Sequence, residues 1–246
     1  MSIFTYANPQ RFLRFVHFGL LPVLLIGSTI SAVGLYAAFA LAPADYQQGE
    51  TVRIMYIHVP AAWLSMACYG LMALSAIGTL VWRHPLADVS QRAMAPIGAS
   101  FTIICLVTGS LWGRPMWGTW WVWDARLTSV LVLFLIYCGI LALWNAFEDP
   151  ARAGRAAAVM TLVGAINLPI VKFSVDWWNT LHQPASVFRM GGPTIDKSML
   201  WPLLLVAIGM TIVMIGLHLA AMRNEILARR LRTMRVRAAS GEGHAH

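Results

Sequence analysis

Six apolar runs, each long enough to cross a membrane as a helix, constrain this chain more than any other feature. About 20 apolar residues in an α-helix span the ~30 Å hydrocarbon layer of a bilayer. The runs cover residues 17–41, 60–82, 93–111, 127–147, 156–175 and 200–222. Only 11% of the residues are charged, against roughly 25% in an ordinary soluble domain. We therefore predict an all-α, polytopic integral membrane protein with six transmembrane helices, forming one domain over residues 1–246.

The basic residues are distributed unequally between the two sides that these six crossings define. Twelve of the 18 lysines and arginines fall on the side that holds both termini. These twelve are Arg11, Arg14, Arg83, Arg92, Arg152, Arg155, Arg223, Arg229, Arg230, Arg232, Arg235 and Arg237. The positive-inside rule then places both termini in the cytoplasm. Residues 223–246 are read as a basic cytoplasmic tail suited to anionic lipid, and no nucleic-acid partner is expected.

The segment LWGRPMWGTWWVWDARLTS, residues 111–129, concentrates tryptophans as no other part of the chain does. With this topology it joins the third and fourth spans on the outer side, which predicts a periplasmic Trp-rich loop over residues 112–126. Its tryptophans are Trp112, Trp117, Trp120, Trp121 and Trp123. An aromatic belt would spread indoles over both interfaces, yet Trp177 and Trp178 also fall on the outer side. Indole faces stack on π-systems, so we favour a flat aromatic ligand.

Two of the seven histidines stand apart from the others. His58 and His182 are predicted in outer loops, one just before the second span and one after the Trp177–Trp178 pair. The remaining five are read as solvated, interfacial or core residues: His17, His84, His218, His244 and His246. His58 and His182 are thus the candidate metal ligands.

The two imidazoles, the cluster of tryptophans and the nearby arginines together favour haem as the ligand. Haem offers an apolar macrocycle for stacking, an iron that accepts axial histidine, and two propionates that suit a guanidinium. Arg126 lies at the hydrocarbon boundary, where a charge must find a partner, and a propionate would serve. Asp124 is predicted either to cap the fourth span or to belong to the haem site. Zinc or copper sites would need closely spaced Cys, Asp or Glu ligands, which the sequence lacks.

The segment WGTWWVWDARLT resembles the WGxxWxWDxRLT signature of the tryptophan-rich, or WWD, haem-handling proteins. The six spans, the flanking histidines and the stretch INLPIVKFSVDWWNTLHQ resemble the CcmC branch of that family, which serves bacterial cytochrome c maturation. The likeness extends over nearly the whole chain. All signature positions agree: Trp117, Gly118, Trp121, Trp123, Asp124, Arg126, Leu127 and Thr128.

The resemblance implies a function that spacing alone does not give. Such proteins hold haem b as transient cargo at the periplasmic face of the inner membrane, between two histidines that match His58 and His182. They pass it to the haem chaperone CcmE, and they work with the ABC transporter of CcmA and CcmB and with the small membrane protein CcmD. The chain has no phosphate-binding glycine motif, so it is expected not to be an enzyme itself.

Two other functions remain as alternatives to haem delivery. A b-type cytochrome that exchanges electrons with a quinone would hold haem between histidines deep in the bundle, where only His218 is placed. A solute transporter would need polar or charged residues at the membrane midplane, and the spans contain few. The cysteines Cys68, Cys105 and Cys138 fall in separate spans and form no CxxC pair, which disfavours thiol chemistry.

Overall fold

The computed structural model describes residues 8–183 and 186–239, and it is helical through all six apolar runs. Its helices are α1 (Pro9–Tyr36), α2 (Met55–Val81), α3 (Pro85–Trp117), α4 (Ala125–Ala146), α5 (Pro150–Gly164), α6 (Asn167–Trp177) and α7 (Lys197–Ala239), with a π-helical turn η2 (Ala37–Leu41) and a 3-10 turn η3 (Glu50–Ile54). The described residues are 82% helical and form no strand. The predicted fold class is confirmed.

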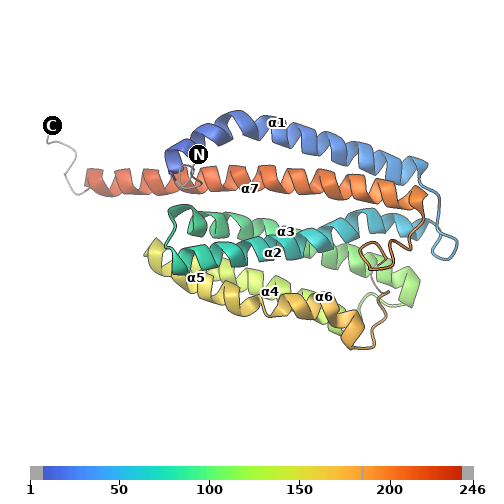
Figure 1. Ribbon diagram of the computed structural model, residues 1–246. Coiled ribbons are helices and arrows are strands. Elements are labelled where there is room, and N and C mark those ends of the chain that lie inside the picture. The colour runs from blue at the N-terminus through green and yellow to red at the C-terminus, as the bar shows by residue number, and fades with distance from the viewer. Residues whose placement is uncertain (1–7, 184–185, 240–246) are drawn as a thin grey trace.

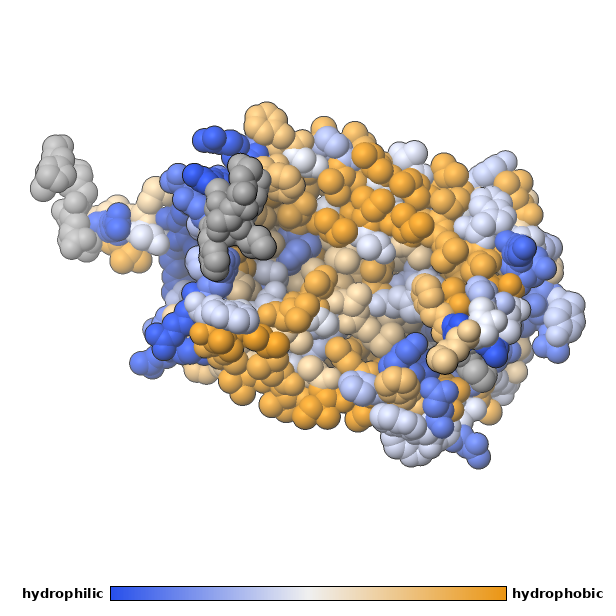
Figure 2. Space-filling model, viewed as in Figure 1, coloured by the Kyte–Doolittle hydropathy of each residue, from blue (hydrophilic) through white to orange (hydrophobic). Residues whose placement is uncertain are grey.

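The surface has the character of a membrane-spanning bundle. Six helical segments are long and apolar enough to cross a bilayer, with α5 and α6 together forming one of them. A broad hydrophobic band separates two more polar ends of the molecule (Figure 2). We call the end with segments 42–49, 118–124 and 178–196 the tryptophan end, and the end with segments 82–84 and 147–149 the basic end. The protein is therefore a multi-pass membrane protein.

Two helices extend further toward the tryptophan end than hydropathy predicts. α3 continues to Trp117, where Gly118 ends it with a left-handed backbone at φ 74°, as helix C-termini commonly do. Trp112 and Trp117 therefore lie on the last turns of α3, and the predicted loop 112–126 is in fact only residues 118–124. α2 begins at Met55, so His58 lies in its first turn and the prediction of a loop position was wrong.

The fifth crossing is broken into two helices where a single one was predicted over residues 156–175. α5 ends at Gly164 and α6 begins at Asn167. Pro169 has no backbone N–H, so it cannot donate to the carbonyl four residues earlier, at Ala165, and its ring clashes with that carbonyl. At the break, two backbone hydrogen bonds span three residues in place of the helical four. Ile166 N–H donates to the Val163 carbonyl, and Leu168 N–H donates to the Ala165 carbonyl.

The basic tail predicted over residues 223–246 is helical as far as the structure describes it. α7 runs without interruption to Ala239 and projects beyond the other helices at the basic end (Figure 1). His244 and His246, which were predicted to be solvated, lie outside the described residues. The last span and the basic segment thus form one continuous helix.

α1 and α7 lie side by side and antiparallel along one flank of the molecule (Figure 1). Glycines spaced seven residues apart line their contact, at Gly27 and Gly34 on α1 and at Gly209 and Gly216 on α7. A Cβ on Gly34 would lie 2.8 Å from the backbone nitrogen of Val206. Small residues of this kind let transmembrane helices approach closely enough to gain van der Waals contact, so these glycines form the seam of the pair.

The glycine seam makes a stability prediction. We expect Gly34→Ala or Gly209→Ala to destabilise the protein by about 1–3 kcal/mol, because the new methyl group must displace backbone of the facing helix. The measurement is thermal unfolding of the protein in detergent, together with disulfide cross-linking between cysteines introduced on α1 and α7. Gly19→Ala on α1 is the matched control, because nothing lies within 4 Å of its Cβ position. Equal effects at Gly19 and Gly34 would contradict the seam.

Candidate functional site

The two candidate histidines both lie at the tryptophan end, and α3 or the segment that follows it contacts each of them. His58 comes from the first turn of α2, and His182 comes from the segment after α6. The two rings are close enough for a positive charge on one to be felt by the other. Residues 124 positions apart in the sequence are therefore brought to the same end of the bundle, as the sequence predicts.

The backbone of α3 fixes the orientation of the His58 ring. His58 Nδ1 lies 3.1 Å from the Cys105 carbonyl oxygen, which can only accept, so Nδ1 must carry the proton and donate. The hydroxyl of Thr108 also lies 3.1 Å from Nδ1 and is free to accept, because its own proton is donated to the Ile104 carbonyl at 2.6 Å. A Cβ on Gly109 would lie 2.9 Å from His58 Cε1. The ring is thus in contact with α3 at a position where only glycine leaves room.

Asp124 holds the His182 ring in the same way. His182 Nδ1 lies 3.2 Å from Asp124 Oδ2, and a carboxylate oxygen accepts, so Nδ1 carries the proton here too. Asp124 Oδ1 also accepts from the backbone N–H of Leu127 at 2.7 Å, which caps α4. The Asp124 side chain is only 5% exposed, so water competes little for either bond. The capping role considered from the sequence is present, and one carboxylate joins the start of α4 to His182.

The His182 imidazole is neutral at pH 7. Burial lowers its pKa below the ordinary value of 6.5, and the field of Arg126 acts in the same direction. The hydrogen bond to Asp124 and its negative charge oppose these effects without cancelling them. The contact between His182 and Asp124 is therefore a hydrogen bond from a neutral ring to a carboxylate, and the ring retains a lone pair.

The two histidines have the tautomer that a metal ligand needs. Because each Nδ1 carries a proton and donates it, the lone pair of each ring is on Nε2. Neither Nε2 has a hydrogen-bond partner among the described residues. Metal-binding histidines typically donate their other ring N–H to a carbonyl or a carboxylate, which is the arrangement at both rings here.

The tryptophans of the segment divide into two groups. Trp112 and Trp117, on the end of α3, meet the imidazoles edge to face, at 5.7 Å from His58 and 4.9 Å from His182 between ring centroids. Trp112 also donates from Nε1 to Gln48 Oε1 at 2.9 Å. Trp120 and Trp123, after the turn at Gly118, are 54% and 75% exposed. The first group therefore contacts the histidines, and the second presents indole to the surroundings.

Trp121 combines features of both groups. Its ring meets that of Trp123 at 5.5 Å and 75°, so it belongs to the exposed pair by contact. Its Nε1, however, is buried and has no hydrogen-bond partner. A buried donor without a partner is costly, and an acceptor brought by a ligand would satisfy it.

Arg126 is bound to α6 rather than to a carboxylate. Its Nε donates to Ser174 Oγ at 2.7 Å, and one terminal nitrogen reaches the Lys172 carbonyl at 3.4 Å. None of the ion pairs within residues 8–183 and 186–239 includes Arg126. Arg126 forms no ion pair in these ranges, although Asp124 and Asp176 are near enough for their charges to act on it, and its pairing with an anionic group of a ligand stays a prediction.

The donor set fits haem better than an isolated metal ion. In the described part of the chain, no three histidine, cysteine or acidic side chains come together as a metal cluster would require. What the tryptophan end offers instead is two imidazoles with an available Nε2, several indoles, a buried indole N–H and an arginine that makes no direct ion pair in the described chain. An apolar macrocycle with axial iron and propionates would use each of these.

Several residues of this site escaped the sequence analysis. The Cys105 carbonyl, Thr108 and Gly109 position His58 from within an apolar run, where hydropathy does not mark them. Ser174 and Gln48 lie in segments distant from the residues that they bind. The signal that could have found part of this site is the pair Gly109 and Gly113, four residues apart on α3, because small residues on one helix face leave room for a facing ring.

Comparison with known proteins gives a consistent result. Residues 2–237 match the family model described as Heme exporter protein C. The chain is 65% identical over 241 residues to Heme exporter protein C of Bradyrhizobium diazoefficiens, covering 98% of this chain and 91% of that one. It is 52% identical over 208 residues to the protein of that name in Escherichia coli, covering 84% of each. A putative cytochrome c biosynthesis ccmC-like mitochondrial protein of Marchantia polymorpha is 50% identical over 177 residues, 72% of this chain and 75% of that one.

The two hydrogen bonds that Asp124 accepts, from Leu127 N–H and from His182 Nδ1, can be tested separately by substitution. We expect Asp124→Asn to keep α4 capped, because asparagine caps helices as well as aspartate does, but to remove the carboxylate from His182. If His182 binds iron, haem retention should fall about 10- to 100-fold, as is typical when such a partner is lost. The measurement is the rate of haem loss to an excess of a soluble haem-binding protein, alongside thermal unfolding.

Asp149→Asn is the matched control, because Asp149 caps α5 at the basic end and has no histidine partner. It should leave haem retention unchanged. Asp124→Ala should lose both roles, with about 1 kcal/mol of stability lost through the cap. Parent-like retention in Asp124→Asn would show that Asp124 is a helix cap and nothing more.

Proposed function

The chain belongs to the heme exporter protein C family, and on that premise we propose that it binds haem at the tryptophan end and delivers it for cytochrome c maturation. The names of its relatives describe haem export and cytochrome c biosynthesis. Haem is then cargo, in the form of haem b, and the protein is a carrier rather than an enzyme. The observation that carries this proposal is the pair of imidazoles, His58 and His182, each with Nδ1 donating and Nε2 available.

In this proposal the two histidines are the axial ligands, and the rest of the site orients the ring and its propionates. Trp112 and Trp117 lie against the imidazoles and would border the macrocycle. Arg126 would pair with a propionate, since none of the ion pairs in the described chain includes it. Haem supplies the iron and the flat apolar surface. The protein supplies ligands whose tautomers are set before haem arrives.

The two histidines are held by different parts of the protein, and this difference affects how haem would be released. His58 is attached to the helical core of the bundle, whereas His182 lies on an irregular segment and is held by Asp124 and Trp117. An incoming partner ligand would therefore displace His182 more readily than His58. Binding through one firm and one exchangeable ligand suits a protein that has to pass its cargo on.

The exposed tryptophans suit a docking surface for the recipient. Trp120 and Trp123 are largely exposed beside the site, and Arg114 lies over the Trp120 ring at 6.0 Å. Exposed aromatic residues are enriched at protein interfaces. We propose that the recipient is the periplasmic haem chaperone CcmE, and that the chain assembles with the CcmA and CcmB transporter and with CcmD.

The orientation follows from the basic residues. Twelve of 18 lysines and arginines belong to the side that holds the chain termini, which the positive-inside rule assigns to the cytoplasm. The tryptophan end would then face the periplasm, across the bacterial inner membrane. The exposed indoles would meet a periplasmic chaperone at that surface.

A b-type cytochrome is the alternative, and the structure gives it little support. His218 lies within the last span, on α7, toward the basic end, and its Nε2 lies 3.1 Å from the Ser90 hydroxyl. His58 and His182 lie at one end of the bundle instead, next to exposed indoles. Ligands at the surface favour transfer of haem over electron transfer through a buried haem.

The ligand assignment predicts a spectrum. We expect the purified protein to show the absorption of low-spin haem with two histidine ligands, and His58→Ala and His182→Ala each to change it, because one axial position is lost. His84→Ala is the control: His84 caps α3 at the basic end and should not alter the spectrum. If neither His58→Ala nor His182→Ala differs from the parent, the assignment is wrong.

The division among the tryptophans predicts that retention and transfer can be separated. Trp117→Ala should speed haem loss severalfold, because Trp117 contacts His182. Trp123→Ala should leave retention near the parent value and slow transfer to the chaperone, because Trp123 is 75% exposed. The experiment follows isotopically labelled haem from this protein to CcmE. Label that stays in place through many reduction cycles, while a quinone turns over, would support the cytochrome alternative.

A further inference from the structure

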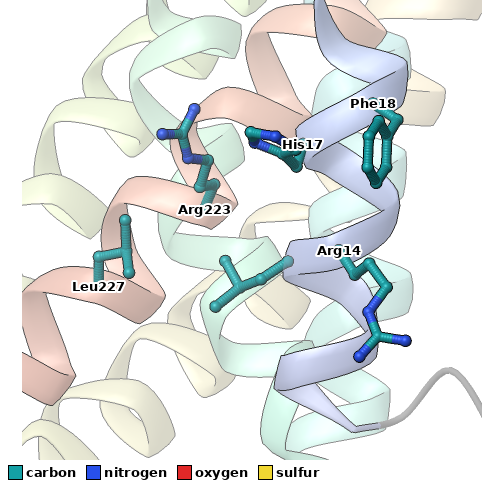
Figure 3. Close-up of a pocket in the computed structure, with 6 residues that line it drawn as sticks. Arg14, His17, Phe18, Arg223 and Leu227 are labelled. Atoms are coloured by element: carbon teal, nitrogen blue, oxygen red, sulfur yellow. The ribbon is translucent and has the colours of Figure 1, made fainter.

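A concave site lies at the basic end, between α1 and α7, opposite the end that holds His58 and His182. Its volume is about 580 Å³, and its lining residues are Leu13, Arg14, His17, Phe18, Arg223 and Leu227. Figure 3 shows His17 of α1 and Arg223 of α7 facing the space between the two helices, with Arg14 one turn before His17. Two guanidinium groups and an imidazole thus line one concavity, and no acidic residue lines it.

These basic groups have no acidic partner within the described chain, and Arg14 and His17 are exposed. Neither Arg14 nor Arg223 takes part in any of the ion pairs that the described ranges contain, and Arg223 is only partly exposed. Other arginines of this end differ: Arg92 pairs with Glu225 at 3.0 Å, and Arg229 pairs with Asp88 at 2.7 Å. The positive-inside rule accounts for basic residues on this side. It does not require two of them to line one concavity that has no acidic residue in its lining.

The depth of the concavity corresponds to the lipid headgroup layer. The apolar run of α1 begins at residue 17 and that of α7 ends at residue 222, so Arg14, His17 and Arg223 lie where hydrocarbon gives way to water. On α1, exposed apolar side chains continue from this level into the span, at Phe18, Leu21 and Leu25. An acyl chain attached to a bound headgroup could lie along them.

We propose that this concavity binds the phosphate headgroup of an anionic phospholipid. Arg14 and Arg223 bind the phosphate, His17 adds a hydrogen bond, and Leu13, Phe18 and Leu227 contact the glycerol and the upper acyl chains. Basic pockets between transmembrane helices on the cytoplasmic side bind anionic headgroups in this way. A lipid bound here bridges α1 and α7 at the end where their glycine contacts stop.

Haem shares this chemistry in part, because its propionates are also anionic. The concavity is poorly suited to haem, however. Phe18 is the one aromatic side chain of its lining besides His17, and it is 74% exposed. The tryptophan end offers several indoles instead. A lipid, which needs a charged contact and an open flank toward the bilayer, fits the observed shape better.

The test compares two double variants with the same change in charge on the same two helices. Arg14→Gln with Arg223→Gln removes the basic groups of the concavity, and Arg11→Gln with Arg230→Gln removes two exposed arginines outside it. Each protein is placed in nanodiscs of phosphatidylglycerol and phosphatidylcholine, then extracted, and its retained lipid is counted by native mass spectrometry. The first variant should retain phosphatidylglycerol with an affinity on the order of tenfold or more below the parent. The second should remain within about twofold.

Three outcomes would overturn the proposal. Equal losses in both double variants would show general attraction of charge to the membrane. Displacement of the lipid by millimolar inorganic phosphate alone would show a site for a free anion. Loss of haem from the first variant, seen in its absorption spectrum, would make this a haem site. Should that variant fail to fold, photoactivatable phosphatidylglycerol in the parent protein must label peptides of α1 and α7, and labelling elsewhere would exclude the site.

Discussion

In hydrocarbon every backbone N–H and C=O must be bonded within the protein, and this constraint arranges the whole molecule. The chain can leave the helical state only near the membrane surfaces, so its irregular segments gather at two ends. The break between α5 and α6 is the exception, and there short-range bonds at Ile166 and Leu168 replace the missing helical ones. A site that needs exchangeable ligands and exposed indoles is therefore confined to an end, where His182 and Trp123 are found.

The last turns of α3 bring the parts of that site together. Gly109 leaves room for the His58 ring, and four residues later Gly113 leaves room for the ring of Trp117, which in turn meets His182. Gly118 then ends the helix in a left-handed conformation, and Trp120 and Trp123 after it are exposed. One rigid helix end thus sets the positions of both imidazoles, which come from opposite halves of the sequence. Their relative placement depends on α3 and not on the long segments between them.

The sequence predicted the six crossings, the all-helical fold and the common location of His58 and His182 at one end. It was wrong about where two helices begin and end, because the ends of an apolar run need not be the ends of the helix. Hydropathy indicates where the hydrocarbon layer ends, whereas a helix ends where its backbone hydrogen bonds end. α3 therefore continues to Trp117, and α2 begins early enough to include His58. The bond between Asp124 and His182 was not predictable, because it joins residues 58 positions apart through the placement of α6. Pro169 lacks the N–H that would continue the helix, but so do Pro22 and Pro96, which lie inside continuous helices, so the break could not be anticipated from the proline alone.

The pairing of α1 with α7 also has a consequence for how the protein is made. α1 packs extensively against α7 alone, and the glycines that allow this contact are useful only when the facing helix is present. Because synthesis proceeds from the N-terminus, the first helix to enter the membrane must wait for the last one before it gains its partner. A ribosome that stops early leaves α1 with its glycine face against lipid. The α1–α7 contact therefore forms only after the last helix has been made, and a product that ends before α7 leaves the glycine seam of α1 uncovered.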